Sequence, residues 1–200
     1  MKLYYTPASP FARKVLIVGL ELDLDSKIER IVLNPWSEGN PVSQYNPAGK
    51  VPVLLTDEGL TLFDSPVICE YLDSLANGSK LYPTKGRARW MALRQNALGD
   101  ALLDAMISRR LESRRAEEQR STSWMDRQLV AVNRCLDAME VSVTELSSNI
   151  TIGHIGWFCA LAHLDFRFAD EPWRPTRPKL ARWFETVAER PSAKSTTPHD

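Results

Sequence analysis

A proline inside an apolar run constrains this chain more than any other feature. Pro52 lies in the run VPVLL, at 51–55, and it cannot donate a backbone hydrogen bond to a neighbouring strand. It must therefore stand at the first residue of a strand, at a sheet edge or in a turn. The next residues, Asp57-Glu58-Gly59, predict a tight turn, so LTLF at 60–63 would return as the second strand of a hairpin.

Two serine–proline pairs predict helix starts, one at each side of this hairpin in the sequence. In Asp64-Ser65-Pro66, we expect Ser65 at the N-cap and the proline at the first helical position. Ser9-Pro10 repeats this signature ahead of apolar residues that recur at helical spacing. A helix therefore precedes the hairpin and another follows it.

The order of the expected elements indicates the fold class of the N-terminal part. Strands are expected at 2–5 and at 27–33, and a polar segment with room for a short helix separates the second strand from the hairpin. The resulting order is β-α-β-α-β-β-α. A chain of this order forms a mixed four-stranded sheet with helices against it, an α/β domain of thioredoxin-like arrangement.

The rest of the chain predicts helices alone. Apolar residues recur at helical spacing over 129–143, and 155–168 is apolar on nearly every side, so this segment should run through the middle of its domain. In the preceding helix, four-residue spacing predicts a buried stripe formed by Leu93, Ala97, Ala101 and Ala105. We therefore expect a first domain at 1–77, a linker at 78–86 and an all-α domain at 87–200.

Charge and composition narrow the classes of partner. The 25 Lys and Arg residues balance the 25 Asp and Glu residues, so no net field attracts nucleic acid or an anionic membrane. No run approaches the roughly 18 apolar residues that a membrane helix requires. The N-terminus is expected to be strand, with neither a basic leader nor a cleavage site, which predicts a cytoplasmic location.

Three motifs, taken in order, resemble the cytosolic glutathione S-transferases of the serine type, as found in bacteria. They are SPFARKV at 9–15, NPAGKVP at 46–52 and the pair Asp64-Ser65. Arg190-Pro191-Ser192 is similar to the closing motif of the family, so the resemblance covers almost the whole chain. It implies a thioredoxin-like glutathione-binding domain, and a helical domain that lines the pocket for a small hydrophobic electrophile.

The resemblance also implies a role for each motif. Ser9 would donate a hydrogen bond to the thiolate of glutathione, and Val51, before a cis bond to Pro52, would pair its backbone with the cysteinyl part. Asp64 would bind the γ-glutamyl ammonium and Ser65 the neighbouring carboxylate. Glutathione is then a co-substrate, and neither a metal nor another cofactor is needed. The expected glutathione-binding set is Ser9, Phe11, Lys50, Val51, Pro52, Asp64 and Ser65.

Each of these residues has a simpler structural interpretation. Ser9 can be only an N-cap, Pro52 only an edge-strand proline, and Asp64-Ser65 only a capping pair. Tyr4 and Tyr5 are alternative hydroxyl donors, because some classes of the family use a tyrosine in the first strand. As neighbours in a strand they point to opposite faces, so at most one of them can face the site.

The helical part offers fewer candidates. His154 and His163 are expected on opposite halves of one helix, each as a satisfied structural histidine. The stretch 109–120 carries both charge signs and is expected to be a solvated face, with Arg109 or Arg110 reaching the second-substrate pocket as the alternative.

One departure from the family pattern concerns a helix start, and one family contact cannot be aligned. In Thr151-Ile-Gly-His154, histidine stands where the family has an acid, so the reciprocal capping box is expected to be incomplete. The residue for the glycyl end of glutathione lies between Leu33 and Gln44, where Asn34 and Trp36 are the candidates.

Two classes of function follow from the resemblance. The first is a transferase that activates the glutathione thiol against an electrophile, including variants that remove a halide, isomerise a double bond or reduce a peroxide or mixed disulfide. The second is a non-catalytic relative that serves in binding or stress regulation. Ser9, Asp64 and Ser65 together favour the enzyme, and serine instead of cysteine at position 9 argues against a thiol transferase. The resemblance further implies a two-fold homodimer.

Overall fold

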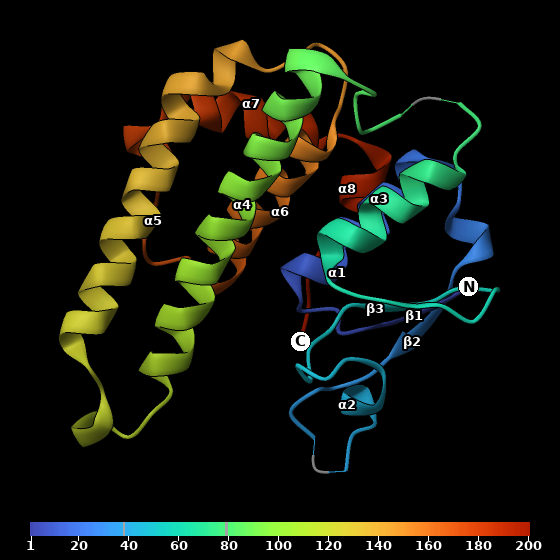
Figure 1. Cartoon of the computed structure of the whole chain (residues 1–200). Helices are drawn as coiled ribbons and strands as arrows, with labels where there is room; N and C mark the ends of the chain where they lie inside the picture. The colour runs from blue at the N-terminus through green and yellow to red at the C-terminus, as the bar shows by residue number, and fades with distance from the viewer. Residues whose placement is uncertain (38, 79) are drawn as a thin grey trace. The chain divides into compact units, whose positions relative to one another are not determined.

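The computed structural model describes residues 1–37, 39–78 and 80–200 (Figure 1). Contacts divide the chain into two compact units, Met1–Arg89 together with Arg190–Asp200, and Trp90–Glu189. From the sequence we expected residues 87–200 to form the second domain, whereas Arg190–Asp200 belong to the first unit. Ser79, within the expected linker, lies outside the described residues.

The first unit contains the predicted four-stranded mixed sheet. Its strands lie in the order β2-β1-β3-β4, with β1 parallel to β2 and antiparallel to β3, and β3 antiparallel to β4. The thioredoxin-like order predicted from the sequence is therefore confirmed. The elements are β1 (Lys2–Tyr5), α1 (Pro10–Glu21), η1 (Asp25–Lys27), β2 (Glu29–Val32), α2 (Val42–Tyr45), β3 (Val53–Leu55), β4 (Thr61–Leu62), α3 (Ser65–Leu75) and the C-terminal α8 (Pro191–Lys194).

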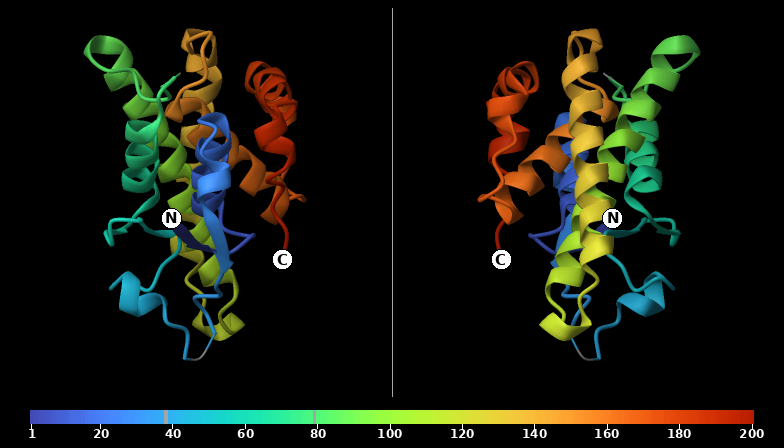
Figure 2. Two further views of the ribbon diagram at one scale, coloured as in Figure 1. Left: turned by 90° about the vertical axis from the view of Figure 1, so that its right-hand side faces the viewer. Right: turned by 90° about the vertical axis from the view of Figure 1, so that its left-hand side faces the viewer.

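Helices cover the two faces of this sheet unequally. α1 and α3 lie together on one face, and the short α2 lies beyond the other (Figures 1 and 2). Alternation along β1 follows these layers, because Leu3 is fully buried whereas the Tyr4 ring stacks on Tyr45 of α2 with centroids 4.7 Å apart. The core of the unit therefore lies between the sheet and α1 with α3.

The hairpin and the following helix differ from expectation at one residue. Gly59, with φ of 85°, closes the turn, and Thr56 Oγ1 accepts a hydrogen bond from the Leu60 N–H at 3.0 Å. The helix α3 begins at Ser65, so its N-cap is Asp64, and the expectation of Ser65 at the N-cap is wrong. The Asp64 side chain forms no capping hydrogen bond.

The C-terminal segment is held against α1 by polar contacts that are buried or partly buried. Arg190 donates to Glu21 through Nε at 2.8 Å, and Ser192 donates to the same carboxylate. Arg13 of α1 donates from Nη2 to the Ala193 carbonyl oxygen at 3.0 Å. Burial by itself would raise the pKa of Glu21, but the hydrogen bonds from Arg190 and Ser192 outweigh it and lower that pKa.

The second unit is all-helical within the described residues, as predicted. α6 is buried along nearly its whole length and is the expected central helix. None of the helices in the described ranges combines the length and apolar character that a membrane crossing requires. The elements are α4 (Gly86–Ser113), whose first turn belongs to the first unit, η2 (Glu117–Gln119), α5 (Thr122–Ser142), η3 (Val143–Glu145), α6 (Ile152–Arg167), η4 (Arg174–Thr176) and α7 (Pro178–Ala188).

Close packing of α4 on α6 depends on glycine. A Cβ atom on Gly99 would come within 2.7 Å of the Gly156 carbonyl carbon, so only glycine permits this approach. Trp157 Nε1 also donates to the Gln95 carbonyl oxygen at 2.8 Å. The buried face of α4 is therefore not the predicted stripe, because Ala97 and Ala101 are exposed.

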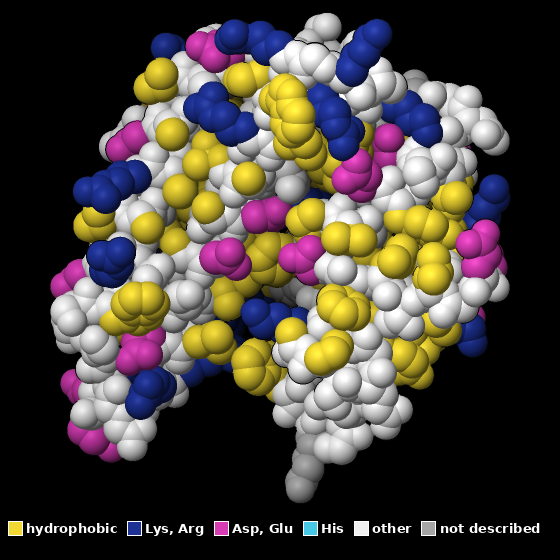
Figure 3. Space-filling model, viewed as in Figure 1, with side chains coloured by type: hydrophobic (Ala, Val, Ile, Leu, Met, Phe, Trp, Pro, Cys, Tyr) yellow, Lys and Arg dark blue, Asp and Glu magenta, His cyan; other side chains and the backbone are white. Residues whose placement is uncertain are grey.

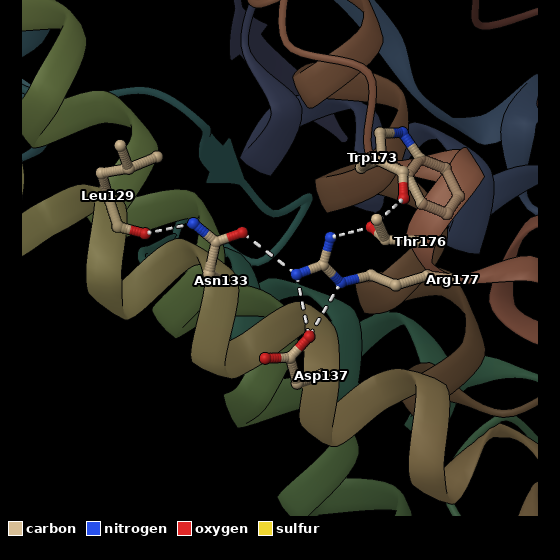
Figure 4. A network of polar contacts seen from close by, with 6 residues as sticks. All are labelled: Leu129, Asn133, Asp137, Trp173, Thr176 and Arg177. Carbon is tan, nitrogen blue, oxygen red and sulfur yellow. Dashed lines mark hydrogen bonds and ion pairs between the residues drawn. The ribbon is translucent and has the colours of Figure 1, made fainter.

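Polar groups of α5 fix the start of α7. Arg177 is buried and donates to Asp137 Oδ1 from Nη2 at 2.8 Å and to Asn133 Oδ1 at 3.0 Å (Figure 4). The Glu140 carboxylate accepts hydrogen bonds from the Lys179 and Leu180 N–H groups, at 3.2 and 2.7 Å. Since α7 has no side-chain cap of its own, Glu140 supplies one from a different helix.

His154 completes the helix start that the sequence predicted to be incomplete. Its Nδ1 accepts a hydrogen bond from the Thr151 N–H at 3.2 Å and lies 2.9 Å from Thr151 Oγ1. Nε2 lies 3.1 Å from the Ser147 carbonyl oxygen. In the neutral tautomer with the proton on Nε2, both ring nitrogens have a partner, because Nδ1 accepts from Thr151 and Nε2 donates to Ser147. An imidazole nitrogen thus serves as the acceptor that a carboxylate provides elsewhere, and the expected defect is absent.

The Glu21 contact predicts a pH-dependent stability. A carboxyl group whose folded pKa is lowered adds stability above its unfolded pKa of about 4.3, and this stability is lost as the pH falls through the folded pKa. Glu21→Gln should lower the free energy of unfolding by about 1.5–3 kcal/mol at pH 7. The difference from the wild type should shrink below about pH 4, as measured by urea denaturation.

Glu29→Gln is the matched control for this measurement. Glu29 forms an exposed pair with Lys2 at 3.6 Å and should contribute little at any pH. Equal acid sensitivity in the wild type and in Glu21→Gln would contradict the assignment.

The His154 cap predicts a second stability effect. His154→Ala should lower the free energy of unfolding by about 1–2 kcal/mol, because the Thr151 N–H loses its acceptor. His154→Asp should recover part of this loss, since a carboxylate can accept from the same N–H. Urea denaturation measures both variants. If the aspartate variant is no more stable than the alanine variant, lost packing and not the cap accounts for the effect.

Candidate functional site

The strand register brings the three sequence motifs to one edge of the sheet. Tyr4, next to the end of β1, pairs with Val53 at the start of β3, and Leu62 at the end of β4 pairs with Leu54. Because these pairings are antiparallel, the end of β1, the start of β3 and the end of β4 lie at the same edge. Ser9 follows the end of β1 after a short turn, Val51-Pro52 directly precedes β3, and Asp64-Ser65 follows β4 after Phe63. Segments far apart in sequence therefore meet there.

Ser9 is the N-cap of α1, and the capping contact uses only part of its hydroxyl. Ser9 Oγ accepts a hydrogen bond from the Ala12 N–H at 3.2 Å. In the described part of the chain, no group accepts a hydrogen bond from the Ser9 hydroxyl proton. A hydroxyl has one donor and two acceptor positions, so the N-cap role leaves the O–H free to donate to a ligand. The first turn of α1 carries no acidic residue, so no carboxylate there offsets the partial positive charge at the N-terminal end of the helix dipole.

The two tyrosines of β1 differ in their surroundings. Tyr4 faces α2, where it stacks on Tyr45, and its hydrogen bond with Tyr45 raises the pKa of Tyr4. A raised pKa makes the hydroxyl a poorer donor to a thiolate. Tyr5 points to the face opposite Tyr4. Of the two alternative donors, Tyr5 therefore remains the rival of Ser9.

Asn46 holds the loop that leads to Val51. Its Nδ2 donates to the Lys50 carbonyl oxygen at 2.9 Å, its Oδ1 accepts from the Ala48 N–H at 3.0 Å, and the side chain is buried. The loop passes through Gly49, whose φ of 63° favours glycine. Asn46 belongs to one of the predicted motifs, but no role was expected for it. Its position at the head of a proline- and glycine-containing turn is the signal that could have found it.

Val51 presents an unused backbone edge. The Val51–Pro52 bond is cis, as predicted, and so is the Phe63–Asp64 bond. Within the described ranges no hydrogen bond occupies the N–H or the carbonyl oxygen of Val51. The residue adjoins β3 without being part of the ladder. An extended peptide can pair with such an edge as an added strand does.

The start of α3 contains an unpartnered buried hydroxyl. Ser65 is 1% exposed, and its Oγ has no hydrogen-bond partner among the described residues. The first intrahelical bond runs from the Ile68 N–H to the Asp64 carbonyl oxygen at 3.0 Å, so the N–H groups of Ser65 and Val67 precede it. Asp64 is exposed and leaves its carboxylate unused for capping. Free donors with a carboxylate beside them suit a ligand end that carries both charge signs.

The other predicted residues lie around this edge with weaker support. Phe11 is half-buried in the first turn of α1, and Lys50 is exposed beside Val51. Asn34 accepts a hydrogen bond from the Trp36 N–H through Oδ1 at 3.0 Å, and Trp36 is 74% exposed. Neither residue is thereby identified as the partner of the glycyl end of glutathione.

In the second unit, the charged stretch 109–120 is mostly exposed, as expected. Arg109 donates to both carboxylate oxygens of Glu171 at 2.6 and 2.7 Å, so this cation is neutralised locally. Both histidines were expected to have satisfied ring nitrogens, and only one of them does. His154 is satisfied, whereas both ring nitrogens of His163 are buried without a hydrogen-bond partner in the described ranges.

Comparison with known proteins shows the family to which the chain belongs. The N-terminal domain model of glutathione S-transferase matches residues 8–75, and the C-terminal domain model matches residues 122–186. The uncharacterized GST-like protein YibF of Escherichia coli is 34% identical over 201 residues, covering 99% of this chain and 98% of YibF. The chain belongs to the glutathione S-transferase family.

Solved structures of family members are similar over the whole chain. A glutathione S-transferase from Methylobacillus flagellatus, with glutathione bound, is 32% identical with a TM-score of 0.95 and 99% coverage of both chains. A family member from Pseudomonas fluorescens Pf-5, with bound S-(propanoic acid)-glutathione, is 38% identical with a TM-score of 0.90 and complete coverage of both chains.

Proposed function

We propose that this protein is a glutathione transferase that binds glutathione along the edge formed by Ser9, Val51 and Asp64-Ser65. The observation that carries this proposal is the Ser65 hydroxyl, buried and without a partner among the described residues, at a helix start whose first N–H groups precede the helical ladder. A buried donor left unpaired costs about 1–3 kcal/mol, which a bound carboxylate would recover. The glutathione bound to the Methylobacillus relative supports the same ligand.

Each part of glutathione finds a group of matching chemistry. The γ-glutamyl carboxylate accepts hydrogen bonds from Ser65 and from the start of α3, and the ammonium beside it pairs with Asp64. The cysteinyl backbone pairs with Val51, whose loop Asn46 holds in place. This pairing directs the cysteine side chain toward Ser9 at the start of α1.

Ser9 then stabilises the thiolate as a hydrogen-bond donor, not as a nucleophile. Its oxygen continues to accept the hydrogen bond from the Ala12 N–H while its hydroxyl proton is donated to the sulfur. A thiol has a reference pKa of about 8.5, and each unit of lowering corresponds to about 1.36 kcal/mol. One hydrogen bond to a charged acceptor supplies about 1.5–3 kcal/mol, and the helix dipole adds to it. Together these contributions are large enough to bring the pKa of the bound thiol close to about 7.

The bound thiolate then attacks an electrophile. We propose that the protein works as a homodimer in the cytoplasm. Exposed apolar residues support the dimer, because Leu60, Phe63 and Val67 are 50%, 40% and 47% exposed. Apolar side chains gather over α3 and the strands beside it in Figure 3. The non-catalytic alternative retains glutathione binding and lacks turnover, so the following variants separate the two.

The Ser9 role predicts a loss of turnover without a loss of binding. Ser9→Ala should bind glutathione nearly as the wild type does and lose about 10²-fold or more in turnover. The pKa of bound glutathione, read from thiolate ultraviolet absorbance, should rise. Tyr5→Phe is the matched control, and a loss confined to Tyr5→Phe would move the catalytic hydroxyl to Tyr5. If neither variant changes turnover and no electrophile reacts with the wild type, the non-catalytic alternative holds.

The γ-glutamyl assignment predicts a graded loss of affinity. Asp64→Ala should weaken glutathione binding by roughly 2–4 kcal/mol, because the ammonium loses its partner, and Ser65→Ala should cost less. Calorimetry measures both, with Asp57→Ala at the turn of the same hairpin as a control that should bind normally. Unchanged affinity in Asp64→Ala would refute the assignment.

The dimer proposal predicts a change of mass in solution. Sedimentation of the wild type should give twice the chain mass of 22.6 kDa at micromolar concentration. Val67→Lys should shift it to 22.6 kDa, because a charge is then buried in the apolar contact. Val32→Lys, at the opposite edge strand and 62% exposed, should remain dimeric. A wild-type monomer under these conditions would overturn the proposal.

A further inference from the structure

The segment that follows α3 turns back along this helix and is fastened near both of its ends. Asp73, buried in the last turn of α3, accepts hydrogen bonds through Oδ1 from the Leu81 N–H at 2.6 Å and from the Tyr82 N–H at 3.3 Å. Lys80 Nζ donates to the Asp73 carbonyl oxygen. In the first turn of α3, the Pro66 carbonyl oxygen accepts a hydrogen bond from the Tyr82 hydroxyl at 3.3 Å. All of these residues belong to the first unit.

Tyr82 is part of the packed interior of the first unit. It is 4% exposed, and the preceding Leu81 is 2% exposed. Arg89 also fastens this segment to α3, because it donates to Glu70 Oε1 at 2.6 Å and to the Pro83 carbonyl oxygen at 3.4 Å. A buried tyrosine normally pairs its hydroxyl, and here the partner is a backbone carbonyl of α3. The fold therefore holds the hydroxyl at the helix start that contains the candidate γ-glutamyl site.

The Pro66 carbonyl belongs to the same peptide group as the Val67 N–H. A trans peptide group is planar, and its C=O and N–H point in opposite directions, so a hydrogen bond to the oxygen also fixes the direction of the N–H. The Val67 N–H precedes the first intrahelical bond of α3, which runs from the Ile68 N–H to the Asp64 carbonyl oxygen. A hydrogen bond accepted by a carbonyl also polarises its amide, which makes the N–H of that amide a stronger donor.

We propose that Tyr82 is a positioning residue for the γ-glutamyl carboxylate of glutathione. Its hydroxyl holds the peptide group whose N–H, together with the buried Ser65 hydroxyl, forms the donor set at the start of α3. Tyr82 acts through the Pro66–Val67 peptide group, and the carboxylate itself is bound by Ser65 and Val67. This inference rests on the proposed glutathione binding, and its test includes a readout on the ligand-free protein.

The first test uses the protein without ligand. Tyr82→Phe removes the hydroxyl and keeps the buried ring. The Val67 amide signal in two-dimensional NMR spectra should shift, because the Pro66 carbonyl loses a hydrogen bond that polarises this amide. Tyr71→Phe is the matched control, since Tyr71 also belongs to α3 and its hydroxyl makes no hydrogen bond within the described ranges. In this control the Val67 signal should stay in place. An unmoved Val67 signal in Tyr82→Phe would overturn the positioning role, whether or not the protein binds glutathione.

The second test compares two peptides that differ in one group. Glutathione carries the γ-glutamyl carboxylate, and γ-aminobutyryl-cysteinylglycine lacks only this carboxylate. By calorimetry, Tyr82→Phe should bind glutathione roughly three- to tenfold more weakly than the wild type, as expected for one weakened donor to a charged acceptor. The variant should bind the analogue within about twofold of the wild type. The pKa of bound glutathione should not change, because Ser9 keeps its place at the start of α1.

The outcomes separate this inference from the proposed function. If Tyr82→Phe binds glutathione as the wild type does, the positioning role fails and the proposed function stands. If the variant weakens both peptides equally, Tyr82 has a general structural role and the inference is again overturned. A wild type that does not bind glutathione would overturn the proposed function and this inference with it. Tyr71→Phe should match the wild type with both peptides.

Discussion

The antiparallel pairing of β1 with β3 is the constraint on which the candidate glutathione site depends. With Tyr4 opposite Val53, the chain leaving β1 and the chain entering β3 meet at one edge of the sheet. β4 pairs with β3 in the same sense and delivers the start of α3 to that edge. A slip of one residue would turn every side chain of the strand to the other face. The fully buried Leu3 and Leu54 oppose such a slip, so the core packing also fixes the site.

The helix starts differ in whether their capping groups are paired within the protein or are left available to a ligand. α7 receives its cap from Glu140 and α6 from His154, so in both cases the acceptor serves a helix start within the protein. α1 is capped by Ser9, which retains a proton to donate. α3 has an N-cap residue, Asp64, whose side chain makes no capping bond, and the Ser65 hydroxyl beside it has no partner in the described ranges. The two incompletely used helix starts lie at the same edge, which is why we assign them together.

Local sequence signals predicted the first unit well because its elements depend on local chemistry. Proline, glycine and serine positions determine turns and helix starts within a few residues, and these predictions agree with the structure apart from a one-residue shift at Ser65. The buried face of α4 was mispredicted because it contains Gln95 and Gly99, and an apolar periodicity cannot detect a face defined by close approach. The contact between Glu21 and Arg190 joins residues far apart in sequence, so no local pattern predicted it. The roles of the site residues remain proposals.

The same distinction separates the candidate glutathione site from the contacts inside the helical unit. The glutathione side is built from short motifs that can be recognised in the sequence alone. Contacts inside the helical unit depend on which residues two long helices bring opposite each other. In the stretch 109–120, Arg109 and Arg110 are indistinguishable by sequence, and only the fold shows that Glu171 pairs with Arg109. Contacts of this kind follow from helix register, which the sequence pattern of a single helix does not contain.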